Sequence, residues 1–434
     1  MKKYIVTLVV LVSSITAFSQ TSPIWVSPYG SGAMDGTSPN DAIAWSTIVT
    51  HVLDEAQNSV HNFELWLLDG VYVEGERFHY TNLNQGQNQH IFSFRIFGGF
   101  NGTETNVFER DLSQYRSTIE IDDHVGLHIE GADLIIVDGL SFTSVNEADS
   151  AAMNLVAADT YVSKCRFENI NIVDPYEQLI KFENGSIRTT KLINCLMVEN
   201  VCSAIIGATG DVDVINCTIS DNTCNYITEF WNGSIPYNNS PYYTLDTYLY
   251  NSIVYDNTFL EQGATPIGST NLDKTCLDHL LTWMVDNSCM YAYPDFVGTG
   301  MEPYSLLATS SLINYGAPNY IDNEPYILKE QDIISHHRFA DFYHVHTALD
   351  LGAYQFFTDD KCDDWDFTDT GFDFDFVFYE EQRGIPGNKG IKKTERAMYM
   401  PQGVYSLSGI KLSDITDNLP SGLYIINGKM QWIP

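Results

Sequence analysis

Four stretches of the chain repeat one pattern of apolar and polar positions. They are "YVSKCRFEN" (161–169), "KLINCLMVEN" (191–200), "DVINCTISDN" (213–222) and "YLYNSIVYDN" (248–257). In each stretch, alternating apolar residues lead to Lys or Asn, a small residue follows, a second apolar position comes two residues later, and Asn ends the stretch. Alternation over four or five residues predicts a half-buried strand.

The phase of the alternation changes inside each stretch. Val212 and Val214 fall on the same parity as Asn216. Cys217 and Ile219 fall on the opposite parity. The chain must therefore bend at Asn216, and Asn is the non-glycine residue that best adopts the left-handed conformation of such a bend. The pattern predicts equivalent bends at Lys164, Asn194 and Asn251.

The small residues after the bends stand at intervals of 30, 22 and 35 residues; they are Cys165, Cys195, Cys217 and Ser252. A constant core with insertions at one turn is typical of a solenoid. We therefore predict an all-β fold in which each stretch forms most of one coil and stacks on the previous coil. The coils are clearest over residues 134–257.

Stacking also predicts where the cysteines lie. Cys165, Cys195 and Cys217 would form one inward column at a spacing of about 4.8 Å, and Cys202 and Cys224 a second. That spacing permits a disulfide in an exported protein, but parallel side chains in a tight interior favour buried thiols. The better disulfide candidates are Cys276 and Cys289, which fall in a predicted insertion. Without C-x-x-C spacing, these cysteines do not indicate a metal site.

The N-terminal residues resemble an export signal. Lys2 and Lys3 precede an apolar run that ends at Val12, and small residues follow as far as Ser19. This order predicts a secretory signal peptide over residues 1–19. The apolar run is shorter than the about 20 residues that span a bilayer, and no later run is longer, so we expect no transmembrane segment.

A helical pattern follows in "SPNDAIAWSTIVTHVLDEA" (38–56). After Ser38-Pro39, one helical face carries Ile43, Ile48, Val52 and Leu53. We predict an amphipathic helix that starts at residue 38 and caps the open end of the first coil.

The charge of the chain limits its partners. It has 22 Lys and Arg against 56 Asp and Glu, which gives a net charge of −34. An acidic surface repels nucleic acid phosphates and anionic membranes. It also argues against gripping a polyanion such as pectin or alginate. We expect an acidic, soluble monomer.

The chain resembles a known family at both ends of the predicted solenoid. The stretches "IWVSPYGSGAMDGTSPNDAIA" (24–44), "LLDGVYVEG" (67–75) and "GGFNGTETNVFERD" (98–111) resemble the start of secreted right-handed parallel β-helix proteins of the pectate-lyase-like superfamily. The stretches within 293–318, 331–338 and 348–356 resemble the closing segment of its choice-of-anchor Q group. The resemblance implies a right-handed parallel β-helix domain over residues 20–357, with a closing motif over 293–357.

Beyond the predicted solenoid the composition changes twice. Residues 358–402 begin "TDDKCDDWDFTDTGFDFDFVF" and continue as a polar connector. Carboxylates are calcium ligands, but the spacing of an EF-hand is missing, so we interpret the segment as an acidic linker and expect no cofactor.

Residues 403–434 alternate apolar positions in short strands between turns, which predicts a small β-sandwich-like domain. This block resembles the C-terminal sorting domain of the type IX (Por) secretion system. The residues that carry the resemblance are Gly409, Pro420, Gly422, Tyr424 and Gly428. The resemblance implies export through the outer-membrane secretion machinery of a Gram-negative bacterium to the cell surface or the medium. The usual basic end is replaced by Met430-Gln431-Trp432.

Two hypotheses of function come from different classes. The preferred one is a non-catalytic surface protein that binds glycans or acts in adhesion, because the predicted insertion 229–250 is rich in aromatic residues that suit sugar faces. The candidate stacking residues are Trp231, Tyr237, Tyr242 and Tyr243. Alternatively, these rings only pack the insertion onto the stack.

The second hypothesis is a polysaccharide lyase or glycoside hydrolase on the same scaffold. In "LIKFENGSIRTTK" (179–191), Lys181 and Arg188 echo the Asn-Gly…Ile-Arg stretch of some alginate and chondroitin lyases, although solvated surface residues would look the same. A hydrolase needs two carboxylates across the glycosidic bond. Candidates are Glu199, Asp211, Asp213 and Asp221.

Four histidines close to one another offer a further candidate, either as a metal cluster or as a structural edge; they are His336, His337, His344 and His346. An enzyme site should bring basic residues and a carboxylate of shifted pKa together on one face of the coils. A binding surface should show a row of exposed aromatic rings instead. The scarcity of basic residues favours the non-catalytic hypothesis.

Overall fold

The computed structural model describes residues 22–57, 62–73, 76–79, 91–183, 190–230, 246–260, 269–278, 288–317, 320, 331–335 and 349–356, together with short strands between 404 and 433. The predicted signal peptide and the linker 358–402 lie outside the described residues. So do Arg188, the aromatic candidates of the insertion (Trp231, Tyr237, Tyr242 and Tyr243) and the four clustered histidines.

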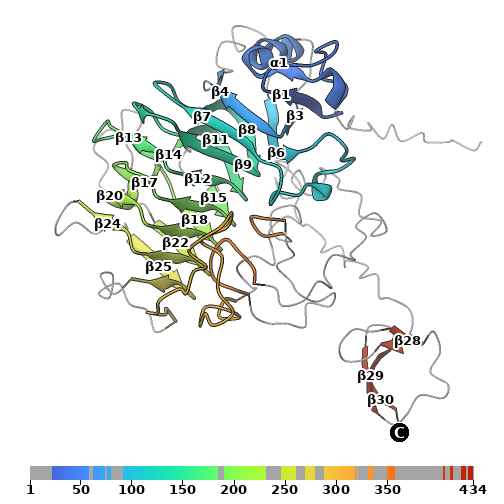
Figure 1. The fold of residues 1–434 in the computed structure, drawn as a ribbon, viewed down its shortest axis with the longest axis vertical. Coiled ribbons are helices and arrows are strands. Elements are labelled where there is room, and N and C mark those ends of the chain that lie inside the picture. The colour runs from blue at the N-terminus through green and yellow to red at the C-terminus, as the bar shows by residue number, and fades with distance from the viewer. Residues whose placement is uncertain are drawn as a thin grey trace, which may run out of the picture.

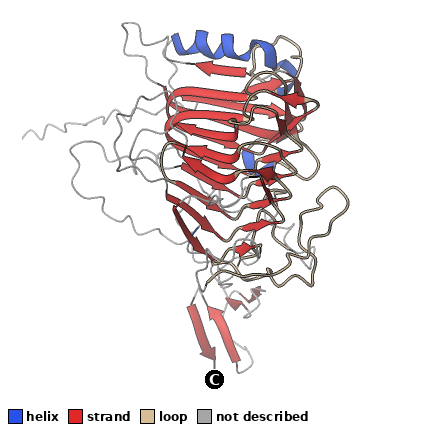
Figure 2. Ribbon diagram, turned by 90° about the vertical axis from the view of Figure 1, so that its left-hand side faces the viewer, coloured by secondary structure: helices blue, strands red, loops and turns tan. Residues whose placement is uncertain are grey.

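Parallel strands from successive coils form two long sheets, as Figures 1 and 2 show. The first sheet has 14 strands. Its main path, in chain order, is β1 (Ile24–Ser27), β2 (Ile43–Ala44), β3 (Asn62–Leu68), β6 (Ile91–Phe100), β8 (Leu127–Asp138), β11 (Met153–Ser163), β15 (Thr190–Ile193), β18 (Val212–Ile215), β22 (Asp246–Tyr250) and β25 (Ser269–Asp273). Its side branch consists of β5 (Glu76–His79), β14 (Gln178–Glu183), β17 (Ala204–Ala208) and β21 (Tyr226–Phe230).

The second sheet has eight strands, and short strand pairs close the remaining turn of the coils. The second sheet contains β4 (Gly70–Val73), β7 (Ser117–Ile121), β9 (Leu140–Ser144), β12 (Arg166–Glu168), β16 (Leu196–Val198), β19 (Thr218–Ser220), β23 (Ile253–Tyr255) and β26 (Cys276–Leu277). The short pairs are β10 (Glu147–Ala148) with β13 (Asn171–Ile172), and β20 (Thr223–Cys224) with β24 (Thr258–Phe259). The fold is a right-handed parallel β-helix, as predicted.

The bends between the two sheets are where the sequence predicted them. Lys164, Asn194, Asn216 and Asn251 all have positive φ, between 50° and 58°. This left-handed conformation shifts the alternation of inward and outward side chains by one residue. Val214 before the bend and Cys217 after it therefore both face the core.

A second row of asparagines stabilises the next turn from inside. Asn200 Nδ2 donates to the Phe167 carbonyl at 2.8 Å and to Asn222 Oδ1 at 2.9 Å. Asn222 Nδ2 in turn donates to Asn257 Oδ1 at 2.9 Å. The Asn that ends the first repeated stretch is not part of this row. Asn169 has φ 56° and corresponds to Glu199 of the next coil, which is the residue before Asn200.

The predicted columns of thiols are present and buried. Cys165, Cys195 and Cys217 are fully buried, and the Cys195 backbone N–H approaches Cys217 Sγ at 3.4 Å. Like these three, Cys202 and Cys224 are thiols rather than disulfides. Cys276 and Cys289, the better disulfide candidates from the sequence, are thiols as well. Cys276 Sγ instead approaches the Ala292 carbonyl at 3.3 Å.

The capping helix exists but is shorter than predicted. The helix α1 spans Ile48–Gln57 and lies over the first coils (Figure 2). Residues 38–47, predicted as its start, instead form two 3-10 turns, Pro39–Asp41 and Trp45–Thr47, around the strand β2. The reason is that Ile43 pairs with Val26 of β1, which commits it to extended backbone.

A closing segment follows the last coil and packs outside the second sheet (Figure 1). We use this name for the described residues 288–317, 320, 331–335 and 349–356. Tyr304, Ile333 and Tyr354 of this segment bury Leu196 and Val198 of β16. Two coils further on, Ile253 of β23 packs with three leucines of the closing segment; these are Leu306, Leu312 and Leu351. The outer face of the second sheet is therefore covered along these coils.

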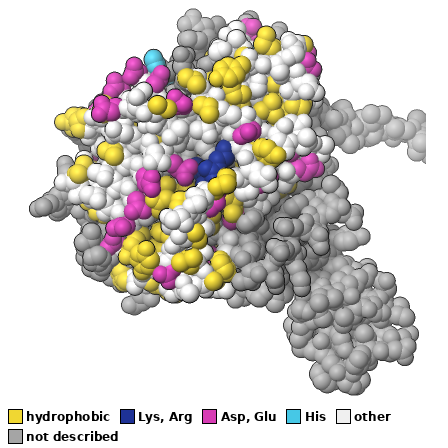
Figure 3. All heavy atoms as spheres, viewed as in Figure 1, with side chains coloured by type: hydrophobic (Ala, Val, Ile, Leu, Met, Phe, Trp, Pro, Cys, Tyr) yellow, Lys and Arg dark blue, Asp and Glu magenta, His cyan; other side chains and the backbone are white. Residues whose placement is uncertain are grey.

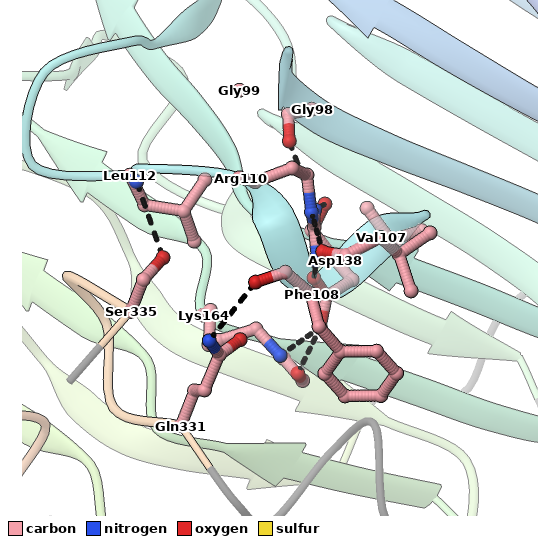
Figure 4. A network of polar contacts seen from close by, with 12 residues as sticks. Gly98, Gly99, Val107, Phe108, Arg110, Leu112, Asp138, Lys164, Gln331 and Ser335 are labelled. Carbon is pink, nitrogen blue, oxygen red and sulfur yellow. Dashed lines mark hydrogen bonds and ion pairs between the residues drawn. The ribbon is translucent and has the colours of Figure 1, made fainter. Parts of the chain in front are cut away.

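A buried charge network lies near the top of the closing segment (Figure 4). Asp138 Oδ1 accepts from Arg110 Nη2 at 2.6 Å, and Asp138 Oδ2 lies 2.7 Å from Lys164 Nζ. Ser163 Oγ also donates to Asp138. All three charged side chains are within 2% of complete burial. Nearby, Ser335 of the closing segment accepts from the Leu112 backbone N–H at 3.2 Å.

The described strands of the C-terminal block form one antiparallel sheet. Its described strands are β27 (Val404–Tyr405), β28 (Lys411–Ser413), β29 (Gly422–Ile426) and β30 (Lys429–Ile433). Of the predicted sorting residues, Gly422 and Tyr424 lie in β29, whereas Gly409, Pro420 and Gly428 lie outside the described residues.

Candidate functional site

The first sheet carries polar side chains on its outer face where β8 and β11 of the main path meet the side branch. In β8, β11 and β14, the residues His128, Asn154 and Lys181 stand in register on three successive coils. Two residues further along the same strands, Glu130, Val156 and Glu183 form a parallel second row. Strand alternation points both rows away from the core, because Leu155 and Phe182 between them are core residues. With Gln178 and Glu229, the polar members of these rows define what we call the polar face.

Each charged side chain of the polar face contacts a neighbour. His128 Nε2 lies 3.4 Å from Glu130 Oε2. Lys181 Nζ forms an ion pair with Glu177, four residues earlier in the chain. Asn154 Nδ2 donates to Glu183 Oε1 at 3.5 Å. The face is therefore a connected set of titratable and amide groups rather than isolated surface charges.

Gln178 reaches across a glycine to complete this set. Lys181 pairs in register with Gly207 of β17, and Gly207 pairs with Glu229 of β21. A Cβ at residue 207 would lie only 2.7 Å from Gln178 Cγ, so the glycine leaves the room that the glutamine side chain fills. Gln178 Nε2 then donates to Glu229 Oε2 at 3.2 Å and to the Tyr176 carbonyl at 2.9 Å.

Two amide oxygens of the polar face are buried and accept no hydrogen bond from the residues that the structure describes. They are Asn154 Oδ1 and Gln178 Oε1. The orientation of both amides is fixed, because each amide nitrogen already donates to a glutamate. An unsatisfied buried acceptor costs roughly 1–3 kcal/mol. Such acceptors would be satisfied by a ligand that donates hydrogen bonds.

Burial raises the pKa of the Glu183 carboxyl. The hydrogen bond from Asn154 opposes this shift, and the negative charge of Glu130 adds to it. The structure thus places a carboxyl of raised pKa among His128 and Lys181 on one face of the coils. This is the pattern that we expected of an enzyme site rather than of a purely aromatic binding surface.

The raised pKa has a consequence for stability. A carboxyl whose folded pKa exceeds its unfolded value of about 4.3 supports folding below that pH and opposes it above. We therefore expect Glu183→Gln to leave the melting temperature unchanged at pH 4 and to raise it at pH 7. Partial solvent screening limits the gain to less than about 1 kcal/mol.

Calorimetry at both pH values would check this, with Glu147→Gln as a matched control because Glu147 is exposed on β10. A lower melting temperature of Glu183→Gln at pH 7 would contradict the assignment.

The structure places one of the two lyase candidates, Lys181, but not the other. Lys181 lies on the polar face, 9% exposed and paired with Glu177. Arg188 lies outside the described residues, so the pairing of the two stays a prediction.

The four carboxylates predicted for a hydrolase fall into two separate groups. Asp213 Oδ2 pairs with Lys191 Nζ at 3.3 Å on the main path of the first sheet, and Asp211 accepts from the Asp246 backbone N–H. Glu199 and Asp221 lie at the turn after the second sheet, where the Tyr304 hydroxyl donates to Glu199 Oε1 at 3.0 Å. Neither group belongs to the polar face.

Sequence reasoning missed six residues of the polar face; they are His128, Glu130, Asn154, Gln178, Glu183 and Glu229. A signal was nevertheless present. The order base, apolar residue, Glu occurs in "HIE" (128–130) and again in "KFE" (181–183). Two such triplets on strands two coils apart place their bases in one row and their glutamates in a second row on the same outer face.

Basic side chains elsewhere in the described chain are largely used in ion pairs. Arg116 Nη2 lies 2.6 Å from Glu302 Oε1, and Arg166 Nη2 lies 2.8 Å from Glu302 Oε2. These contacts join the second sheet to the closing segment. On the face drawn in Figure 3, Lys and Arg side chains gather in a small patch beside a band of acidic side chains. This arrangement offers a polyanion little to bind.

Among the residues that the structure describes, no group of three or more His, Cys, Asp and Glu side chains is placed to hold a metal ion. The described part of the chain also contains no helix with the length and apolar character needed to cross a bilayer.

Comparison with known proteins yields one structural likeness. The chain is similar to a solved structure described as "Crystal structure of pectate lyase Pel9A", with 12% sequence identity and a TM-score of 0.29. The match covers 76% of this chain and 96% of that chain. No protein-family model and no curated protein sequence matches the chain. Because so loose an overlap relates no individual residues, the parallel β-helix is assigned from the pairing of the strands.

Proposed function

We propose that this protein is an exported surface protein that binds a neutral polysaccharide along the polar face. The observation that carries the proposal is the pair of buried acceptors, Asn154 Oδ1 and Gln178 Oε1. Sugar hydroxyls donate hydrogen bonds, and carboxylates such as Glu130 and Glu183 accept further ones. A ligand rich in hydroxyls would therefore satisfy the face without introducing charge.

Charge supports a neutral rather than an acidic glycan. The chain carries a net charge of −34, and the polar face itself holds more carboxylates than basic groups. A polyuronate would bring further negative charge beside Glu130 and Glu183, which like-charge repulsion disfavours. The same repulsion argues against a lyase that acts on uronates.

Export is supported by the sequence at both ends. Residues 1–19 have the order of a secretory signal peptide, and residues 403–434 resemble a type IX sorting domain with Gly422 and Tyr424 in an antiparallel sheet. In the native host, deletion of residues 403–434 should leave the protein in the periplasm. Cell-surface labelling of intact cells would check this, and unchanged surface exposure would contradict the export route.

Binding can be tested on the polar face with one substitution. We expect Asn154→Ala to weaken binding of the purified protein to its neutral polysaccharide by about tenfold, from the loss of one hydrogen bond worth roughly 1–1.5 kcal/mol. The affinity would be measured by calorimetry, after a panel of neutral glucans, mannans, xylans and galactans has been screened.

Stability provides the internal check, because Asn154→Ala also removes an unsatisfied oxygen and should cost little stability. The exposed Asn146→Ala serves as the matched control. If no neutral polysaccharide binds, or if Asn154→Ala binds as tightly as the unaltered protein, the polar face is not the glycan site.

A further inference from the structure

One coil carries an extended turn beside the polar face. Between the end of β13 and the start of β14 the chain inserts residues 173–177. The corresponding turn of the next coil, fixed by the pairing of β14 with β17, is the single residue Ser203. In the coil after that, it is the single residue Asn225. An insertion confined to one coil of a solenoid has to loop outward, and such loops often line the binding face of repeat proteins.

The backbone of this turn is held in one conformation. Its sequence, Asp174-Pro175-Tyr176-Glu177, has Asp at the first and Pro at the second position, as type I turns favour. The Glu177 backbone N–H donates to the Asp174 carbonyl at 3.1 Å, and the Tyr176 backbone N–H donates to Asp174 Oδ1 at 2.9 Å. The Tyr176 carbonyl accepts from Gln178 Nε2 at 2.9 Å. Both backbone polar groups of Tyr176 are therefore satisfied.

Glu177 ties the turn to the coils on both sides. Its side-chain Oε1 accepts from the Ala151 backbone N–H of the previous coil at 3.1 Å and forms the ion pair with Lys181. Its carbonyl accepts from the Ser203 backbone N–H of the next coil at 2.9 Å. The position of the turn relative to the polar face is therefore fixed.

The turn presents an aromatic ring to solvent. Tyr176 is 83% exposed. A single exposed ring carries little information by itself. Here, however, the carbonyl of the same residue is bound by Gln178, whose side chain is almost completely buried and whose Oε1 accepts no hydrogen bond from the described residues. An exposed ring on a fixed backbone thus borders an acceptor that a ligand can satisfy. A tyrosine held in this way loses little conformational entropy on binding.

A ring beside hydrogen-bond acceptors selects among neutral sugars. A pyranose whose hydroxyls are all equatorial presents C–H groups on its two faces and hydroxyls around its rim. Its face can pack on a tyrosine ring while its rim hydroxyls donate to acceptors at the side. In mannose and galactose one ring hydroxyl is axial and places an oxygen on a face, and an α-linkage does so with the linking oxygen. A β-linked glucan or xylan has neither feature.

We propose that Tyr176 is the stacking platform of the polar face and that the ligand is a β-linked glucan or xylan. One sugar unit packs on the Tyr176 ring, and its hydroxyls donate to Gln178 Oε1 and to the Glu229 carboxylate that Gln178 contacts. This inference rests on the proposed binding of a neutral polysaccharide at the polar face and names its class.

The test is calorimetry of the full-length protein with soluble oligosaccharides of each sugar in the panel. We expect the β-linked glucan or xylan to bind more tightly than the mannan and the galactan. Tyr176→Ala should weaken that binding by roughly tenfold, as loss of an aromatic anchor does. Tyr176→Phe should keep the affinity of the unaltered protein, because it retains the ring and removes only the hydroxyl.

Tyr29→Ala is the matched control, since Tyr29 is also 83% exposed but lies in the loop after β1. It should bind as the unaltered protein does. Both alanine variants should unfold at the denaturant concentration of the unaltered protein, because neither ring is buried. A lower midpoint of Tyr176→Ala would mean that the ring supports the turn rather than the ligand, and would overturn the assignment.

Binding data also separate failure of this inference from failure of the proposed function. If Asn154→Ala weakens binding and Tyr176→Ala does not, the stacking platform is overturned and the proposed function stands. Tighter binding of the mannan or the galactan than of the glucan and the xylan overturns the ligand class. If no neutral polysaccharide binds, both the inference and the proposed function are overturned.

Discussion

Replacement of Asp138 by Asn is expected to destabilise the protein by about 3–5 kcal/mol. Asp138 lies between Arg110 and Lys164 and pairs with both (Figure 4), and all three side chains are almost completely buried. The substitution keeps the shape of the side chain but leaves two buried cations without their anion. Breaking a buried ion pair from one side carries a penalty of this size. Chemical denaturation, followed by far-UV circular dichroism, would measure the loss in unfolding free energy.

The pH dependence of this network gives a second readout. Burial opposes ionisation of Asp138, but Lys164 and Arg110 outweigh it and hold the carboxyl pKa below its ordinary value. A lowered folded pKa contributes stability above the unfolded pKa of about 3.9, and this contribution is lost as the pH falls through the folded value. Asp138→Asn should lack this acid-dependent loss.

The matched control is Asp149→Asn, since Asp149 is exposed. It should change the unfolding free energy by less than about 0.5 kcal/mol. A similarly small effect of Asp138→Asn would mean that the network contributes no net stability.

The second large effect is expected from Asn222→Ala, at about 2–4 kcal/mol. Asn222 Nδ2 donates to the Met197 carbonyl at 2.9 Å, and Asn222 Oδ1 accepts from the backbone N–H of Asn200 at 3.0 Å and from its side-chain amide at 2.9 Å. The alanine leaves these buried groups unsatisfied, at a cost of roughly 1–3 kcal/mol each before relaxation. Because the row crosses three coils, the substitution should also reduce the protection of backbone amides from hydrogen exchange in the neighbouring turns.

Asn146→Ala, at an exposed asparagine, controls for the change in residue type. If Asn222→Ala unfolds at the same denaturant concentration as Asn146→Ala, water must replace the lost amide and the row is not needed for stability.

The coils could be predicted from the sequence because their constraints are local. A change of alternation phase at one residue requires a bend, and the identity of that residue as Asn or Lys fits the φ of 50–58° found there. The inner row of asparagines was less accessible. Asn169 and Asn200 both end a repeated stretch, yet only Asn200 belongs to the row, because the two turns differ by one residue.

The start of the helix could not be read from its apolar spacing alone. The sequence separation of Ile43 from Ile48 fits one face of a helix, but it does not fix the backbone conformation. Pairing with Val26 of β1 holds Ile43 in extended backbone. Cys276 and Cys289 illustrate the same limit, since membership of an insertion does not say where two sulfur atoms point. Long-range pairing decided both cases.

The polar face was missed for a different physical reason. Outward polar residues on a solenoid strand look the same in sequence whether they are solvated or gathered into a site. Only the register of the strands shows that Glu130 and Glu183 share a row and that His128 and Lys181 share the next. Because insertions make the coils unequal in length, that register cannot be counted along the chain.

The closing segment also constrains the number of coils in the solenoid. It contacts two bends that lie two coils apart: Asn194 Nδ2 donates to the Gln331 carbonyl at 2.8 Å, and Asn251 exchanges two hydrogen bonds with Ala317 at 2.7 and 2.8 Å. Gain or loss of a whole coil is the simplest way for a repeat protein to change size. Here it would move the later bends away from their partners in the closing segment. Such a change must therefore be accompanied by a matching change in the closing segment. The number of coils in this protein cannot change on its own.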